Sequence, residues 1–265
     1  VSVDTLDDDV AGFTIEETDA ATEVDESGST DIFTVVLDAQ PTSDVVLTIT
    51  SDDTGEATVP ASVTFTAADW DTPQTVTVTG VDDDLVDGTI TSTITIAVDD
   101  ANSDDDFDTV ADQTVSVDTL DDDVAGFTIE ETDGSTEVDE SGSTDIFTIV
   151  LDAQPTNDVV VLATASNDET EATVSGSITF TSENWDTPQT VTVTGVDDDL
   201  VDGDQTYDIT ISIVDTISDD EFDGVADQSV SSTTLDDDAP GFTIEETDAA
   251  TEVDESGSTD IFTVV

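Results

Sequence analysis

The sequence predicts an all-β protein built from tandem seven-stranded antiparallel Greek-key sandwiches, of immunoglobulin-like type, in an elongated array. Three observations predict this fold: a long internal repeat, short alternating runs rich in Val, Thr, Ile and Phe, and clusters of Asp, Gly, Ser and Pro between those runs. Helical periodicity of the apolar residues is absent.

The repeat sets the organisation of the chain. Residues 12–36 return letter for letter as residues 241–265, and the copy at 126–150 differs from them at three positions. The stretch WDTPQTVTVTGVDDDLVDG occurs twice, beginning at Trp70 and at Trp185. A fixed period of 114 to 115 residues indicates one structural unit used repeatedly.

The D-D-D segment that ends each repeat gives the expected domain boundaries. Residues 10–123 and 124–238 form two complete modules, residues 1–9 end a preceding repeat, and residues 239–265 begin a further one. Without an initiator Met or a signal peptide, the chain is expected to be a mature or internal segment. The apolar fraction of 35% is low, but its concentration in strand-like runs lets each module bury a core.

Seven strands are expected in the first module. In the run TVTVTG, Val76 and Val78 should face the core while Thr75, Thr77 and Thr79 face water, because side chains alternate along a strand. The expected strands are residues 13–17 with 22–24, 31–37, 45–50, 56–66, 74–81, 91–98 and 113–119.

The charge of the chain is entirely negative. It has 69 Asp and Glu residues and no Lys, Arg or His, so the formal net charge is −69. Binding to nucleic acid through phosphates is excluded because it needs basic side chains, and docking on anionic lipid is excluded for the same reason. No apolar run approaches the roughly 18 residues of a spanning helix, so no membrane insertion is expected within this segment.

The same composition removes most catalytic chemistry. Without His, Cys or Lys there is no imidazole base, no thiolate and no Schiff-base lysine. Carboxylate pairs, which carry out glycoside hydrolysis, are the remaining option. A catalytic pair is seldom repeated in every module of an array, whereas a structural joint must be, so we expect no enzyme activity.

Acidic runs fall at the ends of the expected strands. Residues 82–84, with Asp87, follow one strand, and residues 121–123 follow another. In a Greek key these two strands point the same way, so both triplets share one end of the module. The turn after the third strand brings Asp53 to that end, and Glu26 lies there just before a turn.

Such clustered carboxylates must be neutralised by a dissolved cation or by a proton, because the chain has no basic side chain. Two unit charges 4 Å apart repel by about 1 kcal/mol in water and by about 4 kcal/mol at an effective dielectric constant of 20. Ca²⁺ accepts six to eight oxygens in flexible geometry, whereas Mg²⁺ demands a stricter arrangement. Neither the EF-hand spacing nor the calcium-binding nonapeptide repeat occurs, so separate loops would build the site. The alternative is a merely solvated acidic surface.

These motifs resemble those of the Calx-β domain family. The matching segments are DDDVAGFTIEETD, VDESGS and TVTGVDDDLVDG, and both complete modules carry them. The resemblance implies Calx-β-like sandwiches that bind Ca²⁺ at the end facing the next domain. Two elements depart from the family pattern: the G-x-D-Y segment is missing, and a W-D-T-P-Q turn replaces the P-G-E turn.

The resemblance also implies the metal ligands. They are a Glu in a V-x-E turn, an Asp after the third strand, the middle D-D-D run with a downstream acid, and the terminal D-D-D run. In the first module these are Glu26, Asp53, Asp82, Asp83, Asp84, Asp87, Asp121, Asp122 and Asp123. In the second module they are Glu140, Asp168, Asp197, Asp198, Asp199, Asp202, Asp236, Asp237 and Asp238.

Other acidic and aromatic features have simpler interpretations. The acidic runs at 99–108 and 218–223 are expected to be solvated loops, with an additional weak cation site as the alternative. Trp70 and Trp185 are expected to anchor the core or cover a strand edge, with a platform for stacking carbohydrate as the alternative.

The sequence therefore predicts a structural role. We expect a calcium-rigidified segment of an extracellular stalk, filament or matrix fibre at a bacterial cell surface. Its partners would be the neighbouring repeats of the same chain and, in a fibre, identical chains. Two alternatives remain open: spacer repeats of an adhesin whose ligand-binding domain lies elsewhere, and a calcium sensor or buffer.

Overall fold

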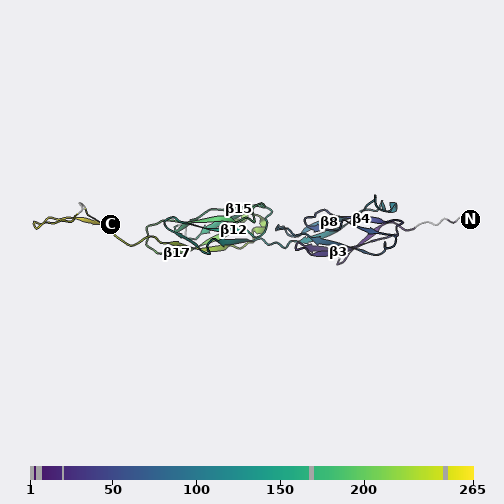
Figure 1. Cartoon of the computed structure of the whole chain (residues 1–265), viewed down its shortest axis with the longest axis horizontal. Helices are drawn as coiled ribbons and strands as arrows, with labels where there is room; N and C mark the ends of the chain where they lie inside the picture. Colours follow the sequence, from purple (N-terminus) through teal and green to yellow (C-terminus); the bar gives the residue numbers. More distant parts are fainter. Residues whose placement is uncertain (1–2, 4–7, 20, 167–169, 247–249) are drawn as a thin grey trace.

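Two β-sandwiches follow one another along the long axis of the molecule, and a short hairpin lies beyond them (Figure 1). The computed structural model describes residues 3, 8–19, 21–166, 170–246 and 250–265. The prediction of tandem all-β sandwiches is confirmed. No helix in the described part of the chain is long and apolar enough to cross a membrane.

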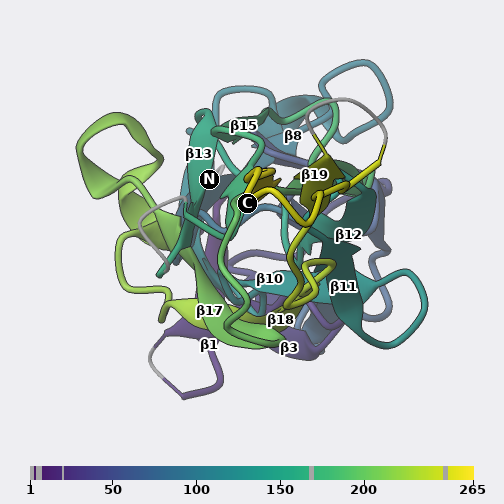
Figure 2. The ribbon, with the colours of Figure 1, turned by 90° about the vertical axis from the view of Figure 1, so that its left-hand side faces the viewer.

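The first module has two sheets, with strand orders β1-β3-β7-β5 and β2-β9-β8-β4-β6. In the view along the long axis, the C-terminal hairpin and the second module lie in front of the first module (Figure 2). The strands are β1 Phe13–Glu17, β2 Thr22–Asp25, β3 Thr30–Leu37, β4 Val45–Ser51, β5 Ala57–Thr58, β6 Ser62–Phe65, β7 Gln74–Gly80, β8 Ile90–Val98 and β9 Gln113–Leu120.

The second module repeats this arrangement, with orders β10-β12-β16-β14 and β11-β18-β17-β13-β15. Its strands are β10 Phe127–Glu131, β11 Thr136–Asp139, β12 Thr144–Leu151, β13 Val159–Ala165, β14 Ala172–Val174, β15 Ile178–Phe180, β16 Gln189–Gly195, β17 Gln205–Ile213 and β18 Gln228–Leu235. A two-stranded sheet of β19 Ile244–Glu246 and β20 Phe262–Val264 follows it.

Two of the seven expected strands divide between the sheets. The expected strand at 56–66 becomes β5 in one sheet and β6 in the other, with Pro60 between them. Proline has no N–H to donate to a ladder, so the pairing stops there. The first strand likewise divides: β1 pairs with β3, and β2 crosses to pair with β9. The β2–β9 pair is parallel, so one pairing departs from the expected antiparallel pattern.

The core follows the alternation read from the sequence. Val76 and Val78 of β7 are fully buried, whereas Thr75 and Thr77 are exposed. Apolar side chains from both sheets meet between them, and Trp70 packs against this cluster while partly exposed, as Trp185 does in the second module. Each sandwich therefore has its own apolar core.

The loop at residues 81–88, here called the docking loop, joins the two modules non-covalently. Leu85 forms an isolated parallel bridge with Gln154 of the second module. The Val86 N–H donates to the Gln154 carbonyl at 3.2 Å, and the Gln154 N–H donates to the Asp84 carbonyl at 2.6 Å. The Val86 side chain is 8% exposed and belongs to the core cluster of the second module.

Most acids of the runs at 99–108 and 218–223 are exposed, as expected of solvated loops, but Asp104 and Asp219 are buried. Each contains a short 3₁₀ helix, Asp105–Phe107 and Asp220–Phe222 respectively. The Asp104 side chain is buried and accepts hydrogen bonds from Thr42 N–H and O–H, from Ser43 N–H and from Asp106 N–H. These hydrogen bonds satisfy both carboxylate oxygens of Asp104. Asp104 therefore has a structural role, which its place in a run of acidic residues does not indicate.

Candidate metal centre

Carboxylates from separate segments meet at the end of the first module that faces the second. β7 and β9 finish at this end, and β5 starts there, since Ala57 pairs with Gly80. The residues brought together are Glu26 after β2, Glu56 before β5, Asp83 after β7, Asp87 before β8, and Asp121 and Asp123 after β9.

A glycine allows the two sheets to approach closely at this end. A Cβ on Gly80 would lie 2.0 Å from the Asp25 carbonyl oxygen, so only glycine fits at the end of β7. The Gly80 N–H donates to the Ser29 carbonyl at 3.0 Å, which fixes the turn that carries Glu26. The end of β2 is thereby held against the end of β7, and Glu26 lies beside Asp83.

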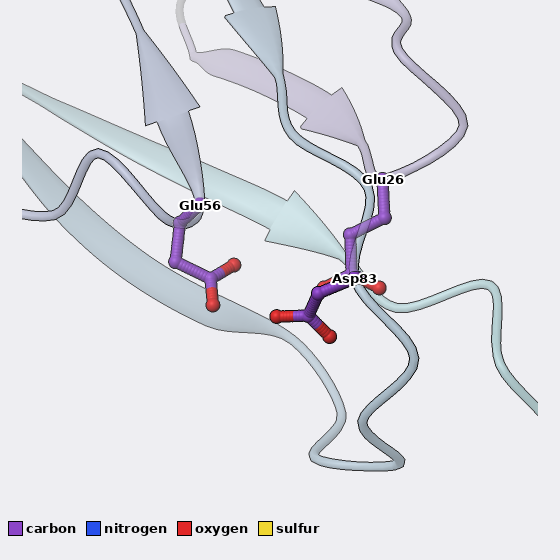
Figure 3. Close-up of side chains that lie close together, drawn as sticks. All are labelled: Glu26, Glu56 and Asp83. Carbon is purple, nitrogen blue, oxygen red and sulfur yellow. The ribbon is translucent and has the colours of Figure 1, made fainter. Parts of the chain in front are cut away.

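Glu26 is the centre of the cluster. Its backbone N–H donates to the Leu120 carbonyl at 3.1 Å, which sets it at the end of β9. The residue is 0% exposed, and neither carboxylate oxygen has a hydrogen-bond partner among the described residues. Its side chain enters the same space as those of Glu56 and Asp83, which point toward one another (Figure 3). A buried carboxylate without partners is strongly unfavourable unless a cation or a proton neutralises it.

The distances between these oxygens match a shared cation. Glu26, Glu56 and Asp83 each offer one oxygen, and the three atoms all lie within 4.8 Å of one another. Glu26, Asp121 and Asp123 form a second group with the same limit. Two oxygens bound to one Ca²⁺ at about 2.4 Å can be at most about 4.8 Å apart. Both groups are compatible with that limit, and Glu26 belongs to each of them.

Burial and mutual repulsion raise the pKa values of the cluster. Burial, followed by the charges of Asp83 and Asp121, raises the pKa of Glu26 to about 7. Burial and the Asp121 charge raise the pKa of Asp123 to about 6. The pKa of Glu56 is raised for the same reasons, burial first and then the charge of Asp87. The site therefore disfavours its own negative charge, as expected of groups that require a positive partner.

Further oxygens in the cluster lack partners. Glu56 Oε2, Asp87 Oδ1 and Asp123 Oδ2 are buried without a hydrogen bond among the described residues. Asp121 has a different role, because its Oδ2 accepts the N–H groups of Asp87 at 3.0 Å and Gly88 at 2.8 Å. Asp121 thus fixes the end of the docking loop against the linker between the modules.

The second module has a related carboxylate cluster at its far end, with one of the two groups found in the first module. Glu140, Asp236 and Asp238 form a group with the 4.8 Å limit, and Glu140 is 1% exposed. Glu140 Oε2, Glu171 Oε2 and Asp238 Oδ2 are buried without a partner among the described residues. Burial raises the pKa of Glu140, and the charges of Asp198 and Asp236 raise it further.

The structure brings some of the sequence-predicted ligands together and leaves others apart. Glu26, Asp83, Asp87, Asp121 and Asp123 converge in the first module, as do Glu140, Asp198, Asp236 and Asp238 in the second. The side chains of Asp53, Asp82, Asp84, Asp122, Asp197, Asp199, Asp202 and Asp237 are exposed at the margins. Asp168 lies outside the described residues. The assignment of ligands stays a prediction.

Sequence reasoning missed Glu56 and Glu171. Both residues come directly before an A-T-V run. Glu56 is 7% exposed, and its backbone carbonyl accepts the Val81 N–H at 2.9 Å. Asp53, predicted in this region, instead uses Oδ1 to accept the Gly55 N–H at 2.9 Å in a local turn. The sequence signal that could have found them is the E-A-T-V motif, which occurs in both modules. Its acid stands directly before a short strand, and in the first module that strand pairs with the end of β7.

The fold and the site define a class: acidic tandem β-sandwiches with a carboxylate cluster of cation-binding geometry at the end of each module. No protein-family model matches the chain, and no curated protein matches it in sequence. Distant β-sandwich likeness is found among solved structures.

Three of these structures illustrate the likeness. CBD12 from CALX1.2 is 15% identical over 75% of this chain and 79% of that one, with a TM-score of 0.32. The calcium binding domain CBD12 of CALX1.1 is 14% identical over 75% of this chain and 80% of that one, also at 0.32. Domains 1–6 of surface layer protein SbsC are 16% identical over 94% of this chain and 32% of that one, at 0.35.

Proposed function

We propose that the chain is a calcium-stiffened segment of an extracellular stalk, filament or matrix fibre at a bacterial cell surface, without catalytic activity. Neighbouring repeats are its partners within the chain, and Ca²⁺ occupies the carboxylate cluster at the end of each module. The observation that carries this proposal is Glu26, which is fully buried beside five other acids and whose two carboxylate oxygens have no hydrogen-bond partner among the described residues.

The composition leaves a dissolved cation as the main source of positive charge. The chain has no Lys, Arg or His, so no basic side chain can form an ion pair with Glu26. Carboxylate ligands from separate loops, at separations compatible with a shared ion, suit Ca²⁺ better than the stricter octahedron of Mg²⁺. A bound Ca²⁺ would supply the charge that offsets repulsion among Glu26, Asp83 and Asp121.

The cluster and the contact between modules share one loop. Asp83 and Asp87 lie in the docking loop on either side of Leu85 and Val86, which contact the second module. Asp121 and Asp123 belong to the covalent linker that follows β9. Fixing these four carboxylates around one site would therefore fix both connections between the modules, which limits rotation of one sandwich against the other.

The expected affinity suits surroundings outside the cell. Extracellular calcium modules of the EF-hand type bind at about 10⁻⁴ to 10⁻³ M, which matches millimolar calcium. On this proposal the array is stiff in such surroundings and slack where calcium is scarce, because the unneutralised carboxylates repel one another.

Small-angle scattering of the whole chain tests this proposal. We expect a longer and narrower distribution of interatomic distances in millimolar Ca²⁺ than in excess chelator, with Mg²⁺ at equal concentration giving a smaller change. The variant Glu26→Gln should lose the calcium response at the internal junction, whereas Glu23→Gln, an exposed Glu on the strand β2 that precedes Glu26, should retain it. Identical scattering with calcium and with chelator would refute calcium stiffening.

A titration separates the alternative of a calcium sensor. A stiffening joint should remain saturated throughout the millimolar range, whereas a sensor should change shape within the concentration range over which its surroundings vary. Glycan binding by the repeats themselves would favour an adhesive role over a purely structural one.

A further inference from the structure

The two sheets of a module differ in how closely the repeats agree. The four-stranded sheet holds 22 residues in β1, β3, β5 and β7, and one of them differs in the second module, where buried Val35 becomes Ile149. The five-stranded sheet holds 32 residues in β2, β4, β6, β8 and β9, and 13 of them differ. Strands of the two sheets alternate along most of the chain, so one copied block of sequence does not account for this contrast.

The agreement extends to side chains that point away from the core. On the two central strands, β3 and β7, these side chains are fully or partly exposed, and together they are here called the threonine face. In the first module the threonine face consists of Thr30, Ile32 and Thr34, which lie opposite Thr79, Thr77 and Thr75. The second module repeats it as Thr144, Ile146, Thr148, Thr190, Thr192 and Thr194, and the third copy repeats its first half as Thr259, Ile261 and Thr263. Surface substitutions usually change stability by less than about 0.5 kcal/mol, so folding alone leaves such positions free to vary.

The outer face of the five-stranded sheet shows that such positions do vary. Thr48 of β4 corresponds to Leu162 in the second module, and Thr93 of β8 corresponds to Asp208. All four side chains point away from the core. An outward threonine can therefore become an apolar residue or an acid without loss of the fold. Strand propensity and contact with water apply equally to both sheets, so they do not explain why only the threonine face is repeated without change.

The chemistry of the threonine face limits what can bind there. None of its six residues is ionisable, although the chain carries a net charge of −69, so two chains can approach through these faces without opposing carboxylates within them. The face has no basic group for an anionic partner and no aromatic ring on which a sugar could stack. A threonine hydroxyl both donates and accepts hydrogen bonds, so rows of threonine complement rows of the same kind.

We propose that the threonine face packs against the threonine face of a second copy of this chain, with the two molecules side by side. This contact rests on the proposed role in a fibre, because it names the surface through which identical chains meet, but it needs no ion. In a contact between like faces every repeat meets another repeat, so all repeats must carry the same outward residues. Neighbouring repeats of one chain follow end to end along the long axis, and they leave the sheet faces uncovered (Figure 1).

A single pair of faces makes a weak contact. Each outward side chain occupies about 30 Å² of a sheet, so six of them cover about 200 Å². A stable specific interface buries about 800 Å² on each partner. The contact must therefore recur at many repeats of an array, and a chain with two complete modules should associate only at high protein concentration. The acidic loops also repel one another, and salt at about 1 M removes most of this repulsion by shortening the screening length to about 3 Å.

Protection of a thiol from alkylation tests the proposal, because the chain has no cysteine of its own. Thr77→Cys places the thiol in the threonine face, and the matched control Thr114→Cys places it at an exposed outward position of β9, in the other sheet. As the protein concentration rises to the millimolar range in high salt, alkylation by excess iodoacetamide should slow at least threefold for Thr77→Cys and stay constant for Thr114→Cys. Equal behaviour of the two thiols would overturn the proposal. So would protection of Thr77→Cys that appears only when neutral dextran is added, because that result identifies a glycan as the occupant.

A change of charge gives a second test by sedimentation equilibrium. Thr77→Asp with Thr192→Asp adds a carboxylate to the threonine face of each module, and it should abolish the rise of mean mass with concentration. Thr114→Asp with Ser229→Asp adds the same charge to the outer faces of the five-stranded sheets, and it should leave that rise unchanged. Equal effects of the two pairs would contradict a contact through the threonine face. If an Asp variant fails to fold, the alkylation rates decide alone.

The face contact and the calcium site can fail separately. The contact uses none of the clustered carboxylates, so association should persist in excess chelator. A protein that stays monomeric in all these conditions, but keeps its calcium response in scattering, refutes the contact alone. Concentration-dependent association of a protein that scatters identically in calcium and in chelator refutes calcium stiffening alone. Association that requires calcium would overturn the contact, because an ion bridging the acidic loops would then hold the copies together.

Discussion

Replacing Glu26 with Gln should have opposite effects on stability with and without calcium. Glutamine keeps the shape of the side chain and removes its charge. In the metal-free protein that charge is a burden, because the carboxylate is fully buried with no partner among the described residues. In the calcium-loaded protein the same charge is a ligand.

The magnitude follows from the raised pKa. Folding moves the pKa of Glu26 from 4.5 to about 7. Because the folded pKa is the higher one, the metal-free fold binds the proton more tightly, and ionisation destabilises it. The penalty is absent below about pH 4.5, grows as pH rises to about 7, and is then constant at about 3 kcal/mol. Glu26→Gln should therefore stabilise the metal-free first module by about 3 kcal/mol at pH 8 and by little at pH 5.

Bound calcium reverses the sign of the pH dependence of stability. A cation favours the ionised form, so the loaded protein should lose stability as pH falls, while the chelated wild-type protein gains it. Loss of one ligand should weaken calcium binding, and each tenfold loss removes about 1.4 kcal/mol of stabilisation.

The assay is thermal unfolding of the whole chain, followed by tryptophan fluorescence. The chain has two tryptophans, and Trp185→Phe leaves Trp70, which packs on the first core, as the single reporter. At pH 8 in chelator, Glu26→Gln should raise the midpoint by on the order of 10 °C, and Glu23→Gln should leave it unchanged. A lower midpoint for Glu26→Gln in chelator, or an undiminished calcium response, would refute the reasoning.

Three further outcomes are expected. Glu56→Gln should lower the calcium affinity measured by calorimetric titration at least tenfold, whereas Asp53→Asn, in an exposed local turn, should change it little. A larger loss of affinity for Asp53→Asn than for Glu56→Gln would instead identify Asp53 as a ligand. Gly195→Ala should lower the free energy of unfolding by about 3 kcal/mol or more, because its Cβ would lie 2.0 Å from the Asp139 carbonyl oxygen. Gly176→Ala places its Cβ in open space and should leave stability unchanged in denaturant unfolding. Equal effects of the two substitutions would contradict the close approach of the sheets. Hydrogen bonds from Thr42, Ser43 and Asp106 lower the pKa of Asp104 from 3.8 to about 2, so its contribution to stability is present above pH 3.8 and lost as pH falls to about 2. Asp104→Asn should lower the thermal unfolding midpoint at pH 7, whereas Asp106→Asn, at an exposed side chain, should not. An unchanged midpoint in both variants would exclude a stabilising role for these hydrogen bonds.

The sequence predicted the strands better than their partition into sheets. Alternation of apolar and polar residues marks buried and exposed faces, as Val76 and Thr77 illustrate, and it is a local property. The transfer of β2 to the opposite sheet, parallel to β9, depends on residues far apart in the chain. The break at Pro60 was readable in principle, because proline interrupts a ladder.

The candidate site was located by the ends of strands and not by ligand geometry. The D-D-D runs pointed to the end of the module where the carboxylates converge, because both runs follow strands that finish at that end. Which acid of each run turns inward depends on loop geometry that the sequence does not display, as Asp83 and its exposed neighbours Asp82 and Asp84 show. Glu56 was missed because a single acid carries no run to mark it.

The place of Val86 within the core of its neighbour couples the stabilities of the two sandwiches. The second module receives an apolar side chain from the first, and burying a valine contributes about 1.5 to 3 kcal/mol. Unfolding of either sandwich breaks this contact, so each loses the same coupling free energy when the other unfolds. In an array with such junctions, mechanical failure of one repeat therefore weakens the repeats on both sides of it.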